Sequence, residues 1–324
     1  MNKLRYSEMF YSIQGEGRYV GVPSVFLRVF GCNFECTGFG QERDKSKWIA
    51  HEEMPHNQDY PDVKKLEDLP VPHVGCDSSF SWGKKWGHLA SYDDIDTLVK
   101  KMEVTVFVNG DWYGDKEHHR SSTAYELSKS LLQNDGVHLV ITGGEPLLKG
   151  FQPALRELLY HPDVLTRFVT FETNGTQIFS FKTNYGFEYK TSNEIEHIRK
   201  FGINKNSGIT WSVSPKLSNS GEKWEDAIRP EALASYNSWP FSYLYLKFVV
   251  RDEEDMKEVH EAVRAYDHAR VNIDAIYLMP ETGFWYGGGP NGVYDYEVAE
   301  LALKYGYKYS PRLQINLFGN EWGT

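Results

Sequence analysis

Short apolar segments rich in β-branched and aromatic residues recur along this chain, and segments with helical periodicity lie between several of them. The strands that we expect cover residues 23–30, 137–142, 167–173, 208–214, 243–250 and 275–280, and a last strand is expected over 313–318. The helices that we expect cover residues 92–102, 151–161, 252–268 and 294–306. Alternation of strands and helices indicates parallel βαβ units and therefore an α/β fold.

About six such repeats are present, fewer than the eight of a closed TIM barrel. We therefore expect a partial (incomplete) TIM-like βα barrel, whose functional residues gather at the carboxyl ends of its strands. The 324 residues are expected to form one domain, 1–324, with insertions. Residues 37–75 are polar and contain four prolines, so they are predicted to be an insertion, and residues 103–122 are a possible second one.

The charge balance limits the classes of partner. The chain has 35 Lys and Arg against 45 Asp and Glu, a net charge of −10, which argues against a protein that coats nucleic acid. No apolar stretch approaches the roughly 20 residues that cross a bilayer. The first ten residues lack the apolar centre of a signal peptide. We expect a cytoplasmic protein without nucleic-acid or membrane partners.

The chain has three cysteines, an odd number that makes a disulfide framework unexpected. Cys32 and Cys36 lie in GCNFEC after the first predicted strand, and Cys76 lies in GCDSSF beyond the insertion. Three thiolates could converge on one soft metal centre and leave a coordination position open. Zinc with a fourth ligand such as His51 or His73, or a [4Fe–4S] cluster with one open iron, would each satisfy this spacing.

A Gly-Gly pair follows the strand predicted over 137–142, in TGGEPLL. Gly143 and Gly144 permit close approach of a ligand to main-chain N–H and C=O groups, which could receive the ammonium of an amino acid. Beside an open iron, this turn suits S-adenosylmethionine, whose methionyl amine and carboxylate chelate that iron.

The motifs GCNFEC…GCD, TGGEP, FETNGT and SPK, in that order, are similar to those of the radical S-adenosylmethionine enzymes. The opening YSIQGEGRYVGVPSVFLRVFGCN and the closing SPRLQINLFGN resemble the 7-carboxy-7-deazaguanine synthase family. The likeness covers nearly the whole chain apart from the insertions. This chain departs from the family's pattern in the 39 residues that separate Cys36 from Cys76.

The resemblance implies a role for each matched position. The cluster ligands would be Cys32, Cys36 and Cys76, and a Ser78 hydroxyl would bind Mg²⁺ where relatives use a Thr. The positions matched to S-adenosylmethionine are Gly143, Gly144, Glu145, Glu172, Asn174, Ser214 and Lys216.

The implied substrate is 6-carboxy-5,6,7,8-tetrahydropterin. Its carboxylate suits the guanidinium fork of Arg28, which could equally form a salt bridge in the core. Gln14 and Glu16 offer polar groups for the pterin edge, and Thr142 matches a further substrate contact. Gln314 stands where relatives often carry a His.

The implied reaction is a radical ring contraction that yields 7-carboxy-7-deazaguanine and releases ammonia, as in queuosine-type biosynthesis. It requires a [4Fe–4S] cluster, S-adenosylmethionine, Mg²⁺ and an electron donor such as flavodoxin or ferredoxin, and a homodimer is expected from the family. Two alternatives remain open at this point. One is an activating enzyme for glycyl-radical enzymes, which acts on a protein, and the other is a zinc-stabilised binding protein without catalysis.

Overall fold

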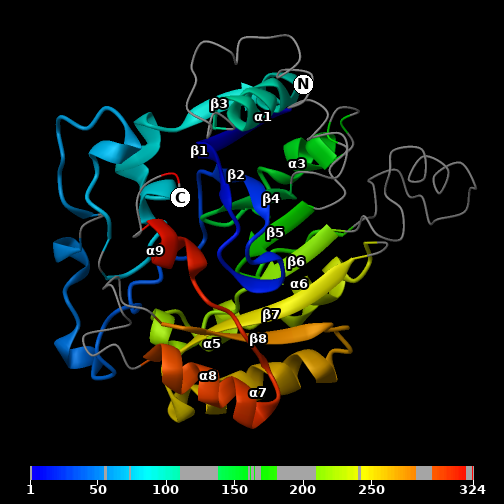
Figure 1. Cartoon of the computed structure of the whole chain (residues 1–324). Coiled ribbons are helices and arrows are strands. Elements are labelled where there is room, and N and C mark those ends of the chain that lie inside the picture. The colour runs from blue at the N-terminus through cyan, green and yellow to red at the C-terminus, as the bar shows by residue number, and fades with distance from the viewer. Residues whose placement is uncertain are drawn as a thin grey trace, which may run out of the picture.

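The structure is a computed structural model, shown in Figure 1. It describes residues 2–54, 57–72, 74–109, 138–159, 161, 164, 169–180, 209–239, 242–281, 294–318 and 323.

All the described strands belong to one sheet of nine strands, in the order β3-β1-β2-β4-β5-β6-β7-β8-β9. The strands are β1 (Lys3–Ile13), β2 (Pro23–Val29), β3 (Ser91–Asp94), β4 (His138–Gly143), β5 (Val169–Thr173), β6 (Ile209–Val213), β7 (Tyr243–Val250), β8 (Ala275–Pro280) and β9 (Lys308–Tyr309). Every pairing from β2 to β9 is parallel, whereas β1 pairs antiparallel with both β2 and β3.

The predicted α/β class is confirmed, because the six strands predicted between residues 23 and 280 are all present and all parallel. The sheet is open, as a partial barrel requires: among the described residues, the edge strands β3 and β9 do not pair with each other. Parallel strands place their carboxyl ends on the same side of the sheet. The insertion and the C-terminal segment lie on one side of the sheet in Figure 1.

Helices cover the sheet and connect its strands. They are α1 (Ile95–Asn109), α3 (Gln152–Leu159), α5 (Trp224–Ala227), α6 (Pro230–Tyr236), α7 (Glu253–His268), α8 (Tyr294–Tyr305) and α9 (Leu313–Phe318). Helix α7 begins after Asp252, whose carboxylate accepts from the backbone N–H of Glu254, and acidic residues fill its first turn. Among the described residues, no helix is long and apolar enough to cross a membrane.

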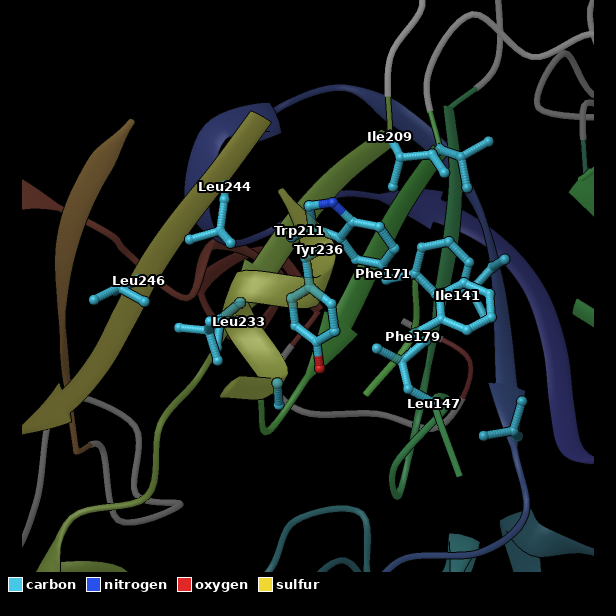
Figure 2. Close-up of a cluster of buried hydrophobic side chains, with 14 of the residues drawn as sticks. Ile141, Leu147, Phe171, Phe179, Ile209, Trp211, Leu233, Tyr236, Leu244 and Leu246 are labelled. Carbon is cyan, nitrogen blue, oxygen red and sulfur yellow. The ribbon is translucent and has the colours of Figure 1, made fainter. Parts of the chain in front are cut away.

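The main core lies between the sheet and these helices. Phe171 of β5 stacks on Trp211 of β6 with ring centroids 5.1 Å apart, and Trp211 stacks on Tyr236 of α6 at 4.8 Å. Figure 2 shows this cluster of rings with neighbouring aliphatic side chains from β4, β6 and β7. Such aromatic packing adds to the stabilisation from buried area and fixes the relative position of the strands.

Two predictions of secondary structure are wrong. Residues 92–102 are not one helix, because residues 91–94 pair with β1 as strand β3, and the Asp94 carboxylate then accepts from the N–H of Thr97 at the start of α1. Residues 313–318 form helix α9 and not a strand. Their alternating apolar pattern is typical of a strand, but they pair with none of the described strands, and Ile315 N–H bonds instead to the Arg312 carbonyl. Strand β1 was not among the predicted strands.

Within the described residues of the predicted insertion, 37–75, the helical elements are short 3₁₀ turns: η2 (Lys45–Lys47), η3 (His51–Glu53) and η5 (Leu66–Asp68). The second half of the insertion contributes to a small separate core, in which its Leu66 and Leu69 pack against Phe30, Phe80 and Trp86 from outside it. Further 3₁₀ turns are η1 (Gly17–Tyr19), η6 (Ser79–Ser81), η7 (Lys84–His88) and η8 (Ser218–Ser220). Of the possible second insertion, residues 103–109 continue α1, and the remainder lies outside the described residues.

Candidate active site

A cavity of about 280 Å³ lies at the carboxyl ends of the parallel strands. All but one of the residues predicted to bind metal, cofactor or substrate line it. They are Gln14, Glu16, Arg28, Cys32, Cys36, Cys76, Ser78, Thr142, Gly143, Gly144, Glu172, Asn174, Ser214 and Lys216. Predicted residues as far apart in the sequence as Gln14 and Lys216, 202 positions, therefore meet at one place, as the barrel expectation requires.

The three cysteines contact one small cluster of apolar side chains, which includes Phe34 and Ala227. The N–H of Phe34 donates to Cys32 Sγ at 3.4 Å, and the indole N–H of Trp82 donates to Cys76 Sγ at the same distance. The insertion separates Cys36 from Cys76 in sequence, and the fold brings both to the same cavity.

Burial raises the pKa of Cys32 to about 12 and that of Cys76 to about 11, and it raises the pKa of Cys36 well above its usual value. The Lys216 ammonium partly opposes this effect at all three thiols. A soft, positively charged metal centre would lower the pKa of such thiols and convert them to thiolates near neutral pH. Within the described part of the chain, no group of three His, Cys, Asp or Glu side chains is arranged to hold a single metal ion.

The Gly-Gly turn after β4 lies directly against the cysteine loop. A Cβ on Gly144 would lie 2.2 Å from the carbonyl oxygen of Gly31 and 2.7 Å from Cβ of Cys32. Gly143 has a φ of +132°, and a Cβ there would lie 2.4 Å from the carbonyl oxygen of Val29. Both glycines are therefore required for the end of β4 to pass this close to the loop that carries Cys32.

Glu145 is the predicted residue that does not line the cavity. Its carboxylate is fully buried and accepts from the Thr173 hydroxyl at 2.8 Å and from the N–H groups of Asn174 and Leu147 at 2.7 and 2.9 Å. Burial raises the pKa of Glu145 to about 7, although these bonds oppose the shift. Its position supports the turns after β4 and β5 from behind the cavity.

Arg28 of β2 lines the cavity and also forms a salt bridge, so both roles that its sequence position allows are present. Its Nε donates to Glu8 Oε1 at 2.6 Å, and its Nη1 donates to the Ser78 hydroxyl at 2.9 Å. Burial would lower the pKa of Arg28, but the Glu8 carboxylate outweighs burial and the pKa is raised. Among the described residues, no hydrogen bond uses its Nη2, so one donor edge of the guanidinium is left for a ligand.

Glu172, at the end of β5, is held by two of the predicted substrate residues. The Gln14 amide donates to Glu172 Oε1 at 3.1 Å, and the Thr142 hydroxyl donates to Oε2 at 2.9 Å. All three side chains line the cavity, so Glu172 lies among predicted substrate residues as well as beside the predicted cofactor residue Asn174.

Glu16 is the centre of a buried ion-pair network. It accepts from Lys247 of β7, from Arg312 Nε at 3.3 Å and from the Gln314 amide at 2.9 Å. Burial favours the neutral acid, but Lys247 and Arg312 outweigh it and lower the pKa of Glu16 to about 2. Arg312 Nη2 also donates to Asp77 at 2.8 Å, so the C-terminal segment joins the QGEG loop to the residue that follows Cys76.

The remaining predicted cofactor residues lie on the turns after β5 and β6. Asn174 Nδ2 donates to Asn33 in the cysteine loop at 3.0 Å, while its side-chain oxygen accepts from the Thr176 hydroxyl at 2.7 Å. Lys216 donates to the Ser214 hydroxyl at 3.3 Å, and its ammonium lies over the ring of Phe39 in the insertion.

Several residues that line the cavity were not predicted. They are Glu8, Asp77, Ser212, Lys247, Glu281 and Arg312, together with the apolar insertion residues Phe39, Val71 and Pro72. One sequence signal was present for Lys247, since a lone Lys within the apolar run YLYLKFVV requires a buried partner. Arg312 and Glu8 carry no comparable signal, because their partners are distant in sequence.

The chain is similar to curated proteins over almost its whole length. A 7-carboxy-7-deazaguanine synthase of Halobacterium salinarum is 27% identical over 98% of this chain and 91% of its own length. Those of Pyrobaculum aerophilum and Rhodopirellula baltica are each 25% identical, over 99% and 100% of this chain and 97% and 90% of their own lengths. No protein-family model matches the chain.

Among solved structures, QueE from Escherichia coli superimposes with a TM-score of 0.44 at 18% identity, over 95% of this chain and 93% of that chain. This superposition is too loose to support an inference, and the fold rests on the strand order. The curated relatives are similar along nearly the whole chain, and they confirm the resemblance to the 7-carboxy-7-deazaguanine synthases that the motifs predict.

Proposed function

We propose that this chain is a radical S-adenosylmethionine lyase of the 7-carboxy-7-deazaguanine synthase type. It would convert 6-carboxy-5,6,7,8-tetrahydropterin to 7-carboxy-7-deazaguanine with loss of ammonia. The observation that carries the proposal is the meeting of the cysteine, TGGEP, FETNGT, SPK and QGEG segments around one cavity. The names of the relatives that match nearly the whole chain support it.

Cys32, Cys36 and Cys76 would bind three irons of a [4Fe–4S] cluster, and the fourth iron would remain open. When bound, the cluster and S-adenosylmethionine supply a 5′-deoxyadenosyl radical. The protein would bind the cofactor and the substrate and hold them in the orientation that the reaction requires. Gly143 and Gly144 would expose main-chain groups to the methionyl part of the cofactor, and its far side would be lined by Asn174, Ser214 and Lys216. Glu145 acts from behind by holding these turns in place.

The proposed substrate residues fall into two groups, one that would bind the substrate carboxylate and one that would bind the polar edge of the pterin ring. The remaining donor edge of Arg28 would receive the substrate carboxylate, since charge-assisted bonds to a guanidinium are strong and directional. Gln14, Thr142 and the Glu172 carboxylate between them would face the pterin's guanidine-like edge. Glu16 would act through the network of Lys247 and Arg312 that it holds together.

The charge of the cavity supports a role for Mg²⁺. Five carboxylates line it against four cationic side chains. The carboxylates are Glu8, Glu16, Asp77, Glu172 and Glu281, and the cations are Arg28, Lys216, Lys247 and Arg312. An anionic substrate in such a cavity gains from a hard divalent cation. The Ser78 hydroxyl, the substrate carboxylate and water molecules would be its ligands.

Two observations favour this function over the alternatives. A zinc-stabilised binding protein would not need the TGGEP, FETNGT and SPK segments at one cavity with the cysteines, yet they line it together. An activating enzyme for glycyl-radical enzymes must admit a segment of a protein. Here the cavity is small and is bordered by the insertion residues Phe39, Val71 and Pro72 and by the C-terminal segment, which suits a small molecule.

The proposed function also implies a domain organisation, an oligomeric state, a cellular location and an electron donor. It would act as one catalytic domain of residues 1–324, in which insertion 37–75 forms one side of the cavity. We propose a cytoplasmic homodimer that receives electrons from a flavodoxin or ferredoxin and binds neither nucleic acid nor a membrane.

One experiment tests the proposal directly. The protein is reconstituted with iron and sulfide under anaerobic conditions and incubated with the carboxypterin, S-adenosylmethionine, Mg²⁺ and a reductant. Mass spectrometry should then detect the deazapurine, and the reconstituted protein should be brown with broad absorption near about 400 nm. A colourless protein that retains one zinc, or a loaded cluster without deazapurine formation, would contradict the proposal.

A further inference from the structure

The backbone at Cys36 has an unusual conformation. Its φ is +48°, in the left-handed region, and Arg270 is the other non-glycine residue with a positive φ in the described part of the chain. A residue with a Cβ is strained in this region, and glycine would avoid that strain. A cluster ligand cannot be glycine, so neighbouring groups must hold this conformation.

Glu222 supplies that support from 186 residues away. Its Oε1 accepts from the backbone N–H of Cys36 at 2.7 Å and from the N–H of Glu35 at 3.0 Å. Two successive N–H groups that point at one anionic oxygen form a nest, and a left-handed residue is the geometry that creates one. By accepting from these two N–H groups, the Glu222 carboxylate stabilises the backbone conformation of Cys36, which determines where the Cys36 side chain lies.

The loop that carries Glu222 is packed closely against the cysteine loop. The Gly38 N–H donates to the Ser220 carbonyl at 2.9 Å, and a Cβ on Gly38 would lie 2.4 Å from the Asn219 carbonyl oxygen. Gly221 has a φ of +87°, and a Cβ there would meet the Thr37 hydroxyl at 3.1 Å. The cysteine loop and the loop that carries Glu222 therefore contact each other through backbone atoms, and each has a glycine at the contact: Gly38 in the first and Gly221 in the second.

The same loop begins at the end of β6 with Ser214 and Lys216, which line the cavity. Bonds from Cys36 and Gly38 to Glu222 and Ser220 consequently join the cysteine loop to the SPK segment.

We propose that Glu222 is a positioning residue for the cluster ligand Cys36, and that it sets the position of the cysteine loop relative to the SPK segment. This inference rests on the proposed function of Cys36 as an iron ligand. Glu222 itself does not line the cavity, so its effect is transmitted through the backbone of Glu35 and Cys36.

Electrostatics argue that the role of Glu222 is geometric. A negative carboxylate beside a thiol opposes formation of the thiolate. A residue selected to favour the ligated thiolate would be cationic. The hydrogen bonds that Glu222 accepts from two backbone N–H groups explain why a long side chain with an acceptor oxygen is present at this position.

Two substitutions separate geometry from charge. Glu222→Gln keeps the length of the side chain and an acceptor oxygen but removes the charge, whereas Glu222→Asp keeps the charge and shortens the side chain by one methylene. Glu225→Ala, at an exposed position three residues further along, is the matched control. Melting temperature and near-ultraviolet circular dichroism report whether each variant is folded.

The first readout uses the full-length protein without iron, under reducing anaerobic conditions. Iodoacetamide labels the thiols, and peptide mass spectrometry follows the rate at each cysteine. We expect Glu222→Asp to increase the labelling rate of Cys36 at least about 5-fold relative to Cys32, because the nest loses its acceptor. Glu222→Gln and Glu225→Ala should change that ratio less than about 2-fold. Equal ratios in all variants, or an increase in Glu222→Gln without one in Glu222→Asp, would overturn the proposal.

Two further measurements cover the remaining outcomes. If Glu222→Asp does not fold, hydrogen exchange decides: the amides of Glu35 and Cys36 should be protected in the parent and, because an acceptor oxygen is kept, should exchange at rates within about 2-fold of the parent in Glu222→Gln. Unprotected amides in the parent, or loss of protection in Glu222→Gln, would overturn the proposal. In reconstituted protein, Glu222→Asp should retain less iron than Glu222→Gln and change the electron paramagnetic resonance spectrum of the reduced cluster. If the parent protein binds no iron, the proposed function fails, whereas the labelling of the iron-free protein still tests Glu222.

Discussion

Arg28 shows how one side chain can serve both the core and the cavity. Its Nε pairs with the Glu8 carboxylate on the neighbouring strand, and its Nη1 donates to the Ser78 hydroxyl, which also lines the cavity. The ion pair holds the guanidinium plane fixed before any ligand arrives. Preorganisation of this kind lowers the entropic cost of binding a carboxylate.

We expect Arg28→Ala to lower kcat/KM for the carboxypterin about 10-fold to about 100-fold, the range that a charge-assisted hydrogen bond supplies. Initial rates at limiting substrate measure this effect. Arg28→Lys keeps the charge without the planar fork and should recover only part of the loss. Because Arg28→Ala also leaves Glu8 unpaired, the double variant with Glu8→Gln is the control for stability. Unchanged turnover at limiting substrate would remove Arg28 from the site.

Gly15 is required for the C-terminal segment to close over the QGEG loop. A Cβ there would lie 1.6 Å from Gln314 Oε1 and 2.8 Å from the backbone nitrogen of Gln314. The side chain could rotate away, but the backbone could not. We expect Gly15→Ala to lower the free energy of unfolding by about 1–3 kcal/mol, as overpacking does.

Thermal denaturation and proteolysis of the C-terminal segment test this expectation. Gly150→Ala is the matched control, because a Cβ at Gly150 meets no atom within 4 Å. It should change stability by less than about 0.5 kcal/mol. A Gly15→Ala protein as stable as this control would show that the C-terminal segment adjusts without cost.

At the scale of elements, the insertion is a packed unit that contributes to the cavity. Leu66 and Leu69 cover Phe30, which immediately precedes the cysteine loop, and Phe80, which follows Ser78. Phe39, Val71 and Pro72 line the cavity itself. The insertion therefore packs against the chain both before Cys32 and after Cys76, and it borders the cavity that the cysteines share.

We expect replacement of both Leu66 and Leu69 by Ala to open the insertion, at a cost of about 2 kcal/mol or more for each buried leucine. Trypsin should then cleave faster at Lys64 and Lys65, and reconstituted protein should hold less iron. Ile49→Ala, at a position 43% exposed within the same insertion, is the control and should behave as the parent. Normal iron content in the double variant would show that the insertion does not support the site.

On the scale of the whole molecule, His138 joins three strands at the end of the sheet opposite the cavity. Its Nδ1 lies 3.0 Å from the Ser24 hydroxyl of β2, and its Nε2 lies 2.7 Å from the Thr170 hydroxyl of β5. The Ser24 hydroxyl donates to the Val22 carbonyl, so the hydrogen-bond pattern assigns the proton to Nδ1. Burial lowers the pKa of His138 to about 3, so the folded protein keeps this side chain neutral.

This shift predicts a loss of stability in mild acid. Between pH 6.5 and pH 3 the unfolded chain binds a proton at His138 that the folded chain does not, so the free energy of unfolding falls as the pH falls through this range. From pH 7.5 to pH 5.5 the loss is about 1.4 kcal/mol for this residue. Denaturant unfolding of the iron-free protein at both pH values measures it.

His138→Gln should remove this part of the pH dependence. The comparison of variant with parent is needed because burial raises the pKa of both Glu145 and Glu281 to about 7, and these two carboxyl groups contribute with the opposite sign over the same interval. Identical pH dependence in the two proteins would show that His138 does not remain neutral in the folded state.

The sequence by itself determined the α/β class, the six parallel strands and the motifs that follow them. Each of these depends on local information: a run of apolar residues forms a buried strand, and the residues that come next must lie at its carboxyl end. The gathering of Cys32, Gly143, Asn174 and Ser214 at one edge then follows from the parallel topology alone.

Only the tertiary structure decided which side chains meet there. Glu16 with Lys247 and Arg312, and Glu222 with Cys36, are pairs separated by more than 180 residues, so no local pattern encodes them. Residues 313–318 alternate like a strand and yet form α9, because they pair with no strand of the described sheet. Periodicity reports which face of a segment is buried, whereas the path of the distant chain determines what buries it.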